Sequence, residues 1–383
     1  MAFGCYVHVP FCSSAKCLYC AFCSIPYDSD FAEKYIYALL DEARRECLEP
    51  ISTLYFGGGT PTSLSSKQLN KTFSGMLSIL NILPDCEITF EASPETLDAE
   101  KLDILRDLGA KRLSIGVQSF SNKLLQTLGR RHDSKTAVSA IETALLCGFE
   151  VSIDLIYGVP GQSLLDWEET LERAVDSGAE HVSLYCLSIE ENTPFERMLN
   201  DGFLPPADED LELEMFEHAG LILSSAGFRR YELSNFAKGN KISRHNLNYW
   251  RGGGYYGLGA SAHSYFPGPP RWTRYANTSD LQKYILQIRE GRSPREFEEV
   301  LIPEQRVEEF IMLRLRLAEG FSREDVMDFL PEIDADDLFE RLGKPISEGF
   351  LEFRNGRVSI PENRLFISNE CVVRVICALQ AKK

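Results

Sequence analysis

The sequence lacks the features of a membrane-spanning or exported chain. No stretch approaches the roughly 18 consecutive apolar residues that a membrane span needs. The first residues lead directly into Tyr6-Val-His8-Val-Pro10, without the basic, apolar and small-residue parts of an export signal. Basic residues are also scarce, with 40 Lys and Arg against 57 Asp and Glu, a net charge of −17. Because phosphate binding needs clustered Lys and Arg, we expect a cytoplasmic protein with no transmembrane segment and no nucleic-acid partner.

Short apolar runs alternate with amphipathic helical patterns over about the first 190 residues. The length of 383 residues suggests two domains, and a hydrophobic share of 44% can fill a sizeable core. This alternation predicts a parallel sheet with right-handed crossovers, in either an open doubly wound form or a partial barrel. Strands are predicted at Cys5–Val9, Thr53–Phe56, Glu87–Glu91, Arg112–Val117, Glu150–Ile156 and His181–Leu187. Helices are predicted at Asp30–Leu48, Ser66–Leu80, Ala99–Leu108, Ser134–Cys147 and Leu164–Ser177.

The alternation fades after about residue 200. Leu211–Ala226 predicts a further helix, and Asn235–Pro270, rich in Gly, Asn and Tyr, predicts a structured loop region. Helical patterns from Leu281 onward precede a candidate hairpin at Gly349–Ile360, with its turn at Asn355-Gly356. We therefore expect a core over 1–235, a connecting region over 236–280, and a small winged-helix-like α+β domain over 281–383.

Cysteine is used unevenly. The chain has 11 cysteines, and four of them fall at positions 12, 17, 20 and 23, directly after the first predicted strand. An odd total without an export signal argues for metal or redox chemistry rather than a disulfide framework. Three thiolates on one loop can hold three irons of a [4Fe–4S] cluster and leave the fourth iron open to another ligand.

Two other metal sites fit this spacing less well. A structural zinc site wants a second Cys or His pair, which Cys371 and Cys377 supply poorly. A ferredoxin-type motif would need a fourth cysteine where Tyr27 stands. An open iron–sulfur site is therefore the favoured interpretation, with zinc as the alternative.

The cysteine segment and the strand before it resemble a known superfamily. Tyr6-Val-His8-Val-Pro10-Phe-Cys12, followed by Cys17-x-Tyr19-Cys20-x-Phe22, is similar to the radical S-adenosylmethionine (SAM) proteins. The similarity covers about residues 5 to 265. It is greatest to the branch of porphyrin and heme metabolism that contains oxygen-independent coproporphyrinogen III oxidases and heme chaperones of the HemW type. It implies a partial (β/α)6 barrel, a [4Fe–4S] cluster, SAM, and an electron donor for the cluster.

One departure from the family concerns the spacing of the cysteines. The family places three residues between its first two cysteines, whereas four residues separate Cys12 from Cys17 here. The resemblance therefore implies Cys12, Cys17 and Cys20 as cluster ligands, or, with a shifted register, Cys17, Cys20 and Cys23. We favour the first set because Tyr19 and the aromatic residue two positions after Cys20 then match the family.

The resemblance also implies residues for the SAM site. Gly57-Gly58-Gly59-Thr60-Pro61 follows an apolar strand, and glycine allows a ligand to approach bare backbone. Carboxylate side chains can bind the ammonium and ribose hydroxyl groups of SAM, and an Arg side chain can bind its carboxylate. His132 is expected to be structural. The family's cofactor residues correspond here to Tyr6, Tyr19, Gly58, Gly59, Thr60, Glu91, Gln118, Arg130 and Asp154.

Two functions remain within this branch. The oxidases carry an N-terminal extension, whereas four residues precede Cys5 here, and they carry a further Cys where Phe22 stands. Arg244-His245-Asn246-Leu-Asn-Tyr249-Trp250 resembles the HNxxYW signature of the heme chaperones. The resemblance therefore implies a chaperone that binds heme, with His245 as a candidate ligand, and passes it to an accepting protein. The alternatives are an oxygen-independent coproporphyrinogen III oxidase and, for His245, a hydrogen-bonded loop histidine.

Overall fold

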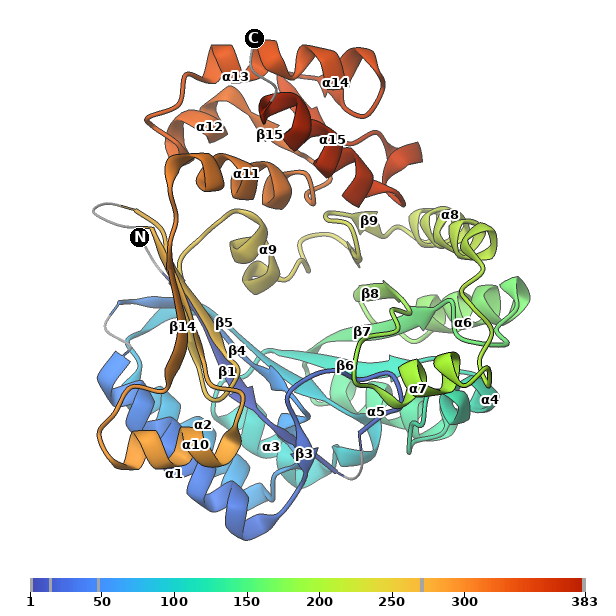
Figure 1. Cartoon of the computed structure of the whole chain (residues 1–383). Coiled ribbons are helices and arrows are strands. Elements are labelled where there is room, and N and C mark those ends of the chain that lie inside the picture. Colours follow the sequence, from blue (N-terminus) through green and yellow to red (C-terminus); the bar gives the residue numbers. More distant parts are fainter. Residues whose placement is uncertain (1–2, 14–15, 47–48, 269–271, 381–383) are drawn as a thin grey trace.

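The computed structural model describes residues 3–13, 16–46, 49–268 and 272–380 (Figure 1). Its central feature is a parallel sheet of six strands in sequence order, joined by helices. The six strands are β1 (Phe3–Val9), β4 (Ile51–Gly58), β5 (Ile82–Ala92), β6 (Arg112–Gln118), β7 (Glu150–Tyr157) and β8 (His181–Cys186). The helices between them are α1 (Ser29–Glu46), α2 (Ser66–Ile79), α3 (Ala99–Asp107), α4 (Asn122–Thr127), α5 (Ser134–Leu146) and α6 (Leu164–Asp176).

The sequence-based α/β prediction is confirmed for these strands and helices. Each predicted strand overlaps an observed one, and the helix ends agree to within about two residues. The last two residues of the predicted helix Asp30–Leu48 lie outside the described residues. Side chains of Ser65, Asp98, Asp133 and Ser163 accept hydrogen bonds from the first turns of α2, α3, α5 and α6, which fixes where these helices begin.

The sheet continues beyond the six strands on both sides. Among the described residues its order is β14-β13-β12-β11-β1-β4-β5-β6-β7-β8-β10-β9, and the end strands do not pair, so the sheet stays open as a partial barrel does. The prediction of a loop region at Asn235–Pro270 was wrong, because short strands there pair with the core; β11 runs parallel to β1. These added elements are β9 (Arg229–Arg230), β10 (Asn235–Ala237), α9 (Arg244–Trp250), β11 (Tyr255–Leu258), β12 (His263–Phe266), β13 (Thr273–Asn277), α10 (Leu281–Arg289) and β14 (Arg295–Val300).

A buried carboxylate fastens α1 to the added strands. Glu42 Oε2 accepts hydrogen bonds from the Gly259 amide at 2.7 Å and from the Tyr284 hydroxyl at 2.6 Å. Its other oxygen, Oε1, accepts one from Asn277 Nδ2 at 2.6 Å. Burial raises the pKa of Glu42 to about 7, although the three donors lower it. The segment from β11 to α10 therefore packs together with the six parallel strands and their helices in one hydrophobic core, which we call the first core.

The C-terminal unit has a hydrophobic core of its own, which begins at Phe310. The predicted boundary at residue 281 falls inside the first core, since Leu281, Tyr284 and Ile288 pack there. The hairpin predicted at Gly349–Ile360 is present, and Asn355 and Gly356 both have the positive φ that its turn requires. The unit contains α11 (Pro303–Arg314), β15 (Phe321–Ser322), α12 (Arg323–Phe329), α13 (Ala335–Arg341), α14 (Gly343–Ser347), β16 (Glu352–Arg354), β17 (Arg357–Ser359) and α15 (Ser368–Gln380).

Two helices and a short strand pair complete the fold. α7 (Pro194–Asn200) and α8 (Glu209–Ser225) follow β8, and β2 (Phe11–Cys12) pairs with β3 (Ile25–Pro26) around the cysteine segment. In the view of Figure 1 the C-terminal unit lies above the sheet, and α1, α2, α3 and α10 lie below it. Across the described ranges, no helix combines the length and apolar character needed to cross a membrane.

Candidate functional site

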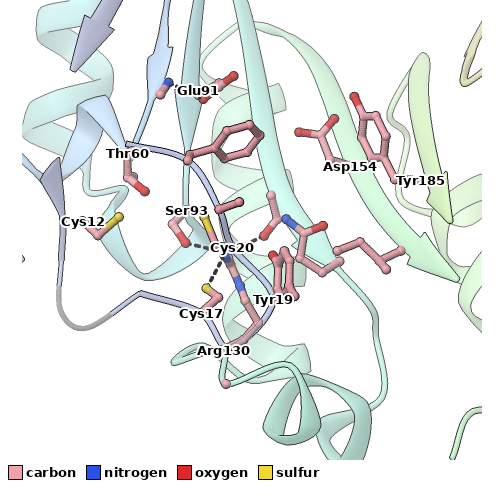
Figure 2. Close-up of a pocket in the computed structure, with 18 of the residues that line it drawn as sticks. Cys12, Cys17, Tyr19, Cys20, Thr60, Glu91, Ser93, Arg130, Asp154 and Tyr185 are labelled. Atoms are coloured by element: carbon pink, nitrogen blue, oxygen red, sulfur yellow. Dashed lines mark hydrogen bonds between the residues drawn. The ribbon is translucent and has the colours of Figure 1, made fainter. Parts of the chain in front are cut away.

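A cavity of about 590 Å³ lies at the carboxyl ends of the parallel strands. This is the edge at which parallel α/β sheets bind ligands. Figure 2 shows the cysteine segment on one side of the cavity, with Glu91 and Asp154 on the strands opposite. The sequence-predicted residues that line it are Cys12, Cys17, Tyr19, Cys20, Gly58, Gly59, Thr60, Glu91, Gln118, Arg130 and Asp154.

The cysteine segment is held in place by backbone hydrogen bonds to neighbouring elements. The Leu18 amide donates to the Leu128 carbonyl at 3.1 Å, and the Leu18 carbonyl accepts from the Phe195 amide at 3.0 Å. Burial raises the pKa of the Cys12 and Cys20 thiols, and the nearby Cys17 adds to the rise in both. These three cysteines therefore lie near one another at one end of the cavity.

Cys23 faces a different direction. Its Sγ donates a weak hydrogen bond to the Ser279 carbonyl at 3.3 Å, and its own carbonyl lies 2.8 Å from Nε2 of His8. Cys23 is not among the residues that line the cavity. Within the loop between Cys12 and Cys17, residues 14 and 15 lie outside the described part of the chain.

No three His, Cys, Asp or Glu side chains among the described residues converge as ligands of a single ion. In an iron–sulfur cube each thiolate binds a different iron, so its ligands do not need to share one point.

Arg130 connects the cysteine segment to the strands. Its Nη1 donates to Cys17 Sγ at 3.4 Å, and its Nη2 donates to the Ser93 hydroxyl at 2.7 Å and to the Gly116 carbonyl at 2.6 Å. Its Nε is buried and has no acceptor among the described residues. No carboxylate of the described residues forms an ion pair with this guanidinium within 4.0 Å. The side chain can therefore donate to an anionic ligand group without first losing a protein partner.

The glycine segment at the end of β4 is packed too closely for larger residues. Gly58 has φ of +109°, and a Cβ there would lie 2.4 Å from the ring of His8. A Cβ on Gly59 would lie 2.5 Å from the Phe11 carbonyl oxygen. Gly58 and Gly59 thus pack against His8 and Phe11 and still line the cavity, where the lack of side chains leaves backbone open to a ligand.

Two carboxylates stand on the strands opposite the cysteines. Glu91 accepts hydrogen bonds from the Tyr55 hydroxyl at 2.9 Å and the Gly58 amide at 3.1 Å. Burial raises the pKa of Glu91 to about 7, and the nearby Asp154 adds to the rise. Burial also raises the pKa of Asp154, whose oxygens accept from the Ser114 hydroxyl at 3.1 and 3.2 Å. A cationic ligand group would relieve this mutual repulsion.

Gln118 has a strained backbone at the rim of the cavity. Its φ is +66°, a left-handed value that residues other than glycine rarely adopt. The β6–β7 pairing is irregular between Gly116 and Gln118, which turns the Gln118 side chain toward the cavity. Strain of this kind is concentrated at functional sites.

Three predicted side chains lie outside the cavity lining. The Tyr6 hydroxyl is 3.0 Å from Nδ1 of His8, whose ring packs against Gly58 of the cavity wall, and Tyr6 itself does not line the cavity. His132 is buried, with its Nε2 3.1 Å from the Val117 carbonyl and its Nδ1 3.4 Å from Glu95, which fits its expected structural role. His245 is described next.

His245 is 1% exposed and both of its ring nitrogens face protein partners. Nδ1 is 2.9 Å from the Thr53 hydroxyl, Nε2 is 2.8 Å from the Tyr249 hydroxyl, and the ring stacks on Tyr55 at 5.0 Å. Burial lowers the pKa of His245 to about 3, so the ring is neutral. To bind a heme iron, this imidazole must first leave one of its two partners and turn out of the core.

The cavity also contains side chains that the sequence analysis did not identify. Ser93 and Glu95 follow Glu91 in the same segment; Glu95 accepts hydrogen bonds from Ser93 at 2.8 Å and from Ser13 at 3.2 Å. Tyr185 near the end of β8 and Ser188 just after it also line the cavity, and Tyr185 lies beside Asp154 (Figure 2). Their position after a strand end was the available signal, but Ser and Tyr are too common in loops for that signal to be specific.

Comparison with known proteins agrees with this geometry. Residues 6–174 match the Radical SAM superfamily, and residues 301–365 match the HemN C-terminal domain. The heme chaperone HemW of Bacillus subtilis (strain 168) is 35% identical over 372 residues, which cover 95% of this chain and 97% of that protein. The chain belongs to the HemW family of radical SAM proteins. HemW of Escherichia coli (strain K12) is 33% identical, with 90% of each chain covered.

Two further relatives extend the comparison. A mitochondrial protein of Bos taurus, radical S-adenosyl methionine domain-containing protein 1, is 33% identical and covers 87% of this chain and 77% of its own length. The structure of coproporphyrinogen III oxidase (HemN) from Escherichia coli superimposes with a TM-score of 0.82 at 22% identity, covering 98% of this chain and 90% of that one. At this identity the superposition shows a shared fold.

The cavity fits the two groups that a radical SAM family implies. Three cysteines at one end would supply soft thiolates for iron. The buried Nε of Arg130 has no acceptor among the described residues and could donate to an anionic group. On the opposite strands, Glu91 and Asp154 are buried carboxyl groups with raised pKa values, and a nearby cation would favour their charged forms. SAM carries a carboxylate, an ammonium group and a sulfonium, which match these donors and acceptors.

Proposed function

We propose that this protein is a heme chaperone that binds heme and delivers it to target proteins. The observation that carries the proposal is the similarity to HemW along nearly the whole chain, at 35% identity over 95% of this chain. The heme-accepting protein and the electron donor for the cluster are the partners it requires. The described cysteines are free thiols, which suits a reducing compartment such as the cytoplasm.

Cys12, Cys17 and Cys20 would hold the [4Fe–4S] cluster, and Cys23 would stay unbound. The direction of Cys23 toward Ser279 supports this choice. Bound together, a cluster and SAM supply reductive cleavage of a sulfonium bond to a 5′-deoxyadenosyl radical.

The residues of this chain would position the cofactor. Arg130 would donate to its carboxylate, and Glu91 and Asp154 would attract its cationic groups. Gly58, Gly59 and Thr60 would offer backbone and hydroxyl groups along one wall, and Tyr19 and Gln118 would complete the enclosure. The burial of Arg130 Nε without a partner among the described residues supports this arrangement.

The histidines of the chain are the candidates for the residue that binds the heme iron. Of the six in the chain, four are buried, and His218 bonds to Glu168 at 2.7 Å. His263 is exposed and forms no side-chain hydrogen bond within the described residues. His245 is the sequence-based candidate, and His263 is an exposed histidine with no side-chain hydrogen bond to lose within the described residues.

The test uses the full chain reconstituted anaerobically with iron and sulfide. Heme is added in steps, the Soret band is recorded, and retention after gel filtration is measured. We expect retention near one heme per chain and transfer to an apo-hemoprotein. In the same preparation, coproporphyrinogen III is added with SAM and a reductant, and we expect no protoporphyrinogen. Turnover without heme retention would overturn the proposal in favour of the oxidase.

His245→Ala and His263→Ala are compared in that titration, with far-UV circular dichroism to monitor folding. A shifted Soret band that disappears only in folded His245→Ala would support the sequence-based ligand. A band that persists there and disappears in His263→Ala would assign the iron to the exposed histidine.

A further inference from the structure

A second cavity, of about 170 Å³, lies between the first core and the C-terminal unit. Its walls come from β8, α8 and residues 230–236 on one side, and from Arg316 and the start of α15 on the other. A water molecule occupies about 30 Å³ in the liquid, so the cavity is large enough for a single small ionic group. We refer to it as the seam cavity.

Arg230 forms one wall of the seam cavity and is held flat between two aromatic rings. Its guanidinium carbon lies 4.3 Å from the ring centre of Phe216 and 4.5 Å from that of Phe236. Its Nη1 donates to the Leu233 carbonyl at 2.8 Å. The stacking fixes the plane of the guanidinium, and the remaining N–H groups have no acceptor in the described part of the chain.

Arg316 faces the same cavity from the other unit. Its Nη1 donates to the Ser368 hydroxyl at 3.4 Å, and its Nη2 donates to Asn369 Oδ1. Its backbone carbonyl accepts from the Leu233 amide at 3.0 Å, so the two arginines are connected through one short backbone segment. Ser368 begins α15, whose amino-terminal amides add partial positive charge.

The two arginines of the seam cavity have no directly paired carboxylate among the described residues. Neither arginine forms an ion pair within 4.0 Å with any carboxylate of the described residues. Glu232 acts on both arginines and Glu362 acts on Arg230, in each case without an ion pair within 4.0 Å. Glu232 is 1% exposed, and burial raises its pKa to about 7. Burial lowers the pKa of both arginines, as expected for a desolvated cation without a counter-ion. Such charges favour an anionic ligand.

We propose that the seam cavity binds one small oxyanion, a phosphate or carboxylate group, between Arg230 and Arg316. Planar guanidinium groups bind both oxyanions through paired N–H donors. Because the arginines belong to different units, the anion would connect the first core to the C-terminal unit. Cys186 lines both this cavity and the larger one, so the two ligand sites share a wall.

The proposal is tested by chemical labelling of the reconstituted full chain. Phenylglyoxal modifies accessible arginines, and peptide mass spectrometry measures the rate at each one. Inorganic phosphate at about four times its dissociation constant should slow modification of Arg230 and Arg316 about fivefold, against chloride of equal ionic strength. The exposed Arg374 on α15 should be unaffected. If the modification rates of Arg230 and Arg316 are the same in phosphate as in chloride, as expected for Arg374, the proposal is overturned.

Propionate in place of phosphate distinguishes the two ligand classes. Protection by propionate at similar concentrations would indicate a carboxylate-bearing ligand, and protection by phosphate alone would indicate a phosphate-bearing one; both outcomes support the site. A second measurement uses Arg316→Gln, with Arg374→Gln as the matched control on α15. Phosphate should raise the melting temperature of the wild type and of the control by about 1–2 °C and should not raise that of Arg316→Gln. An equal rise in Arg316→Gln would overturn the proposal even if the labelling is slowed.

Discussion

At the scale of single residues, two sets of three cysteines can be considered as cluster ligands, and the second is shifted along the chain by one cysteine. The directions of the cysteine side chains favour the first set. Cys12, Cys17 and Cys20 line the large cavity, whereas Cys23 points to the Ser279 carbonyl. We expect Cys12→Ala to abolish the visible absorption of the reconstituted cluster and Cys23→Ala to leave it unchanged. Iron and sulfide analysis of the same samples serves as the control. The opposite result would assign the cluster to Cys17, Cys20 and Cys23.

We expect Glu91 to make cofactor binding depend on pH. Its pKa in the free protein is raised to about 7 by burial and by Asp154, so below that pH it carries a proton that a cationic ligand must displace. The affinity for SAM should therefore fall as pH drops below about 7, by up to about tenfold per pH unit for one displaced proton. Glu91→Gln should bind SAM at least about tenfold more weakly at pH 8 and lose this dependence.

Isothermal titration of anaerobic protein at pH 6, 7 and 8 measures the effect of Glu91. Glu172→Gln, which alters an exposed carboxylate on α6, should keep the wild-type profile. A wild-type affinity that does not change between pH 6 and pH 8 would contradict the assignment of Glu91.

At the scale of elements, Glu42 connects α1 to Gly259 just after β11, to β13 and to α10 through three donors. Glu42→Ala leaves these donors buried without an acceptor and should lower the free energy of unfolding by about 3 kcal/mol. Urea unfolding followed by circular dichroism measures this. Glu46→Ala, one turn further along α1, removes a part-exposed ion pair with Arg295 and should cost less than about 1 kcal/mol. Equal losses in the two variants would show that Glu42 is not a structural connection.

The elements also show why the loop prediction failed at residues 235–270. The strands there are four residues or shorter, β11 contains Gly257, and their partners lie far away in sequence, with β11 pairing to β1. Local periodicity cannot detect strands this short. By contrast, the six parallel strands are long and apolar, and their positions were predicted to within a few residues.

At the scale of the whole molecule, the two largest hydrophobic clusters of the described residues are the first core and the core of the C-terminal unit. Phe321 is fully buried in the C-terminal core, and Phe90 is fully buried in the first core on β5, next to Glu91. Both substitutions to alanine should destabilise their core by about 3–5 kcal/mol. Phe321→Ala should keep the SAM affinity of the wild type at 20 °C, whereas Phe90→Ala should weaken it. Calorimetric unfolding and SAM titration of both variants test this, and an equal loss of affinity in the two would contradict independent cores.

The sequence by itself determined the α/β class, the six strand–helix units, the hairpin at Asn355-Gly356, and the superfamily to which the cysteine segment belongs. These features depend on local periodicity, turn chemistry and motif spacing, which residues close in sequence carry. The tertiary structure decided which of the predicted side chains meet: it placed Arg130 against Cys17, turned Cys23 away and enclosed both nitrogens of His245. Such contacts join residues up to 256 positions apart, and only the packing of the whole chain fixes distances across that separation.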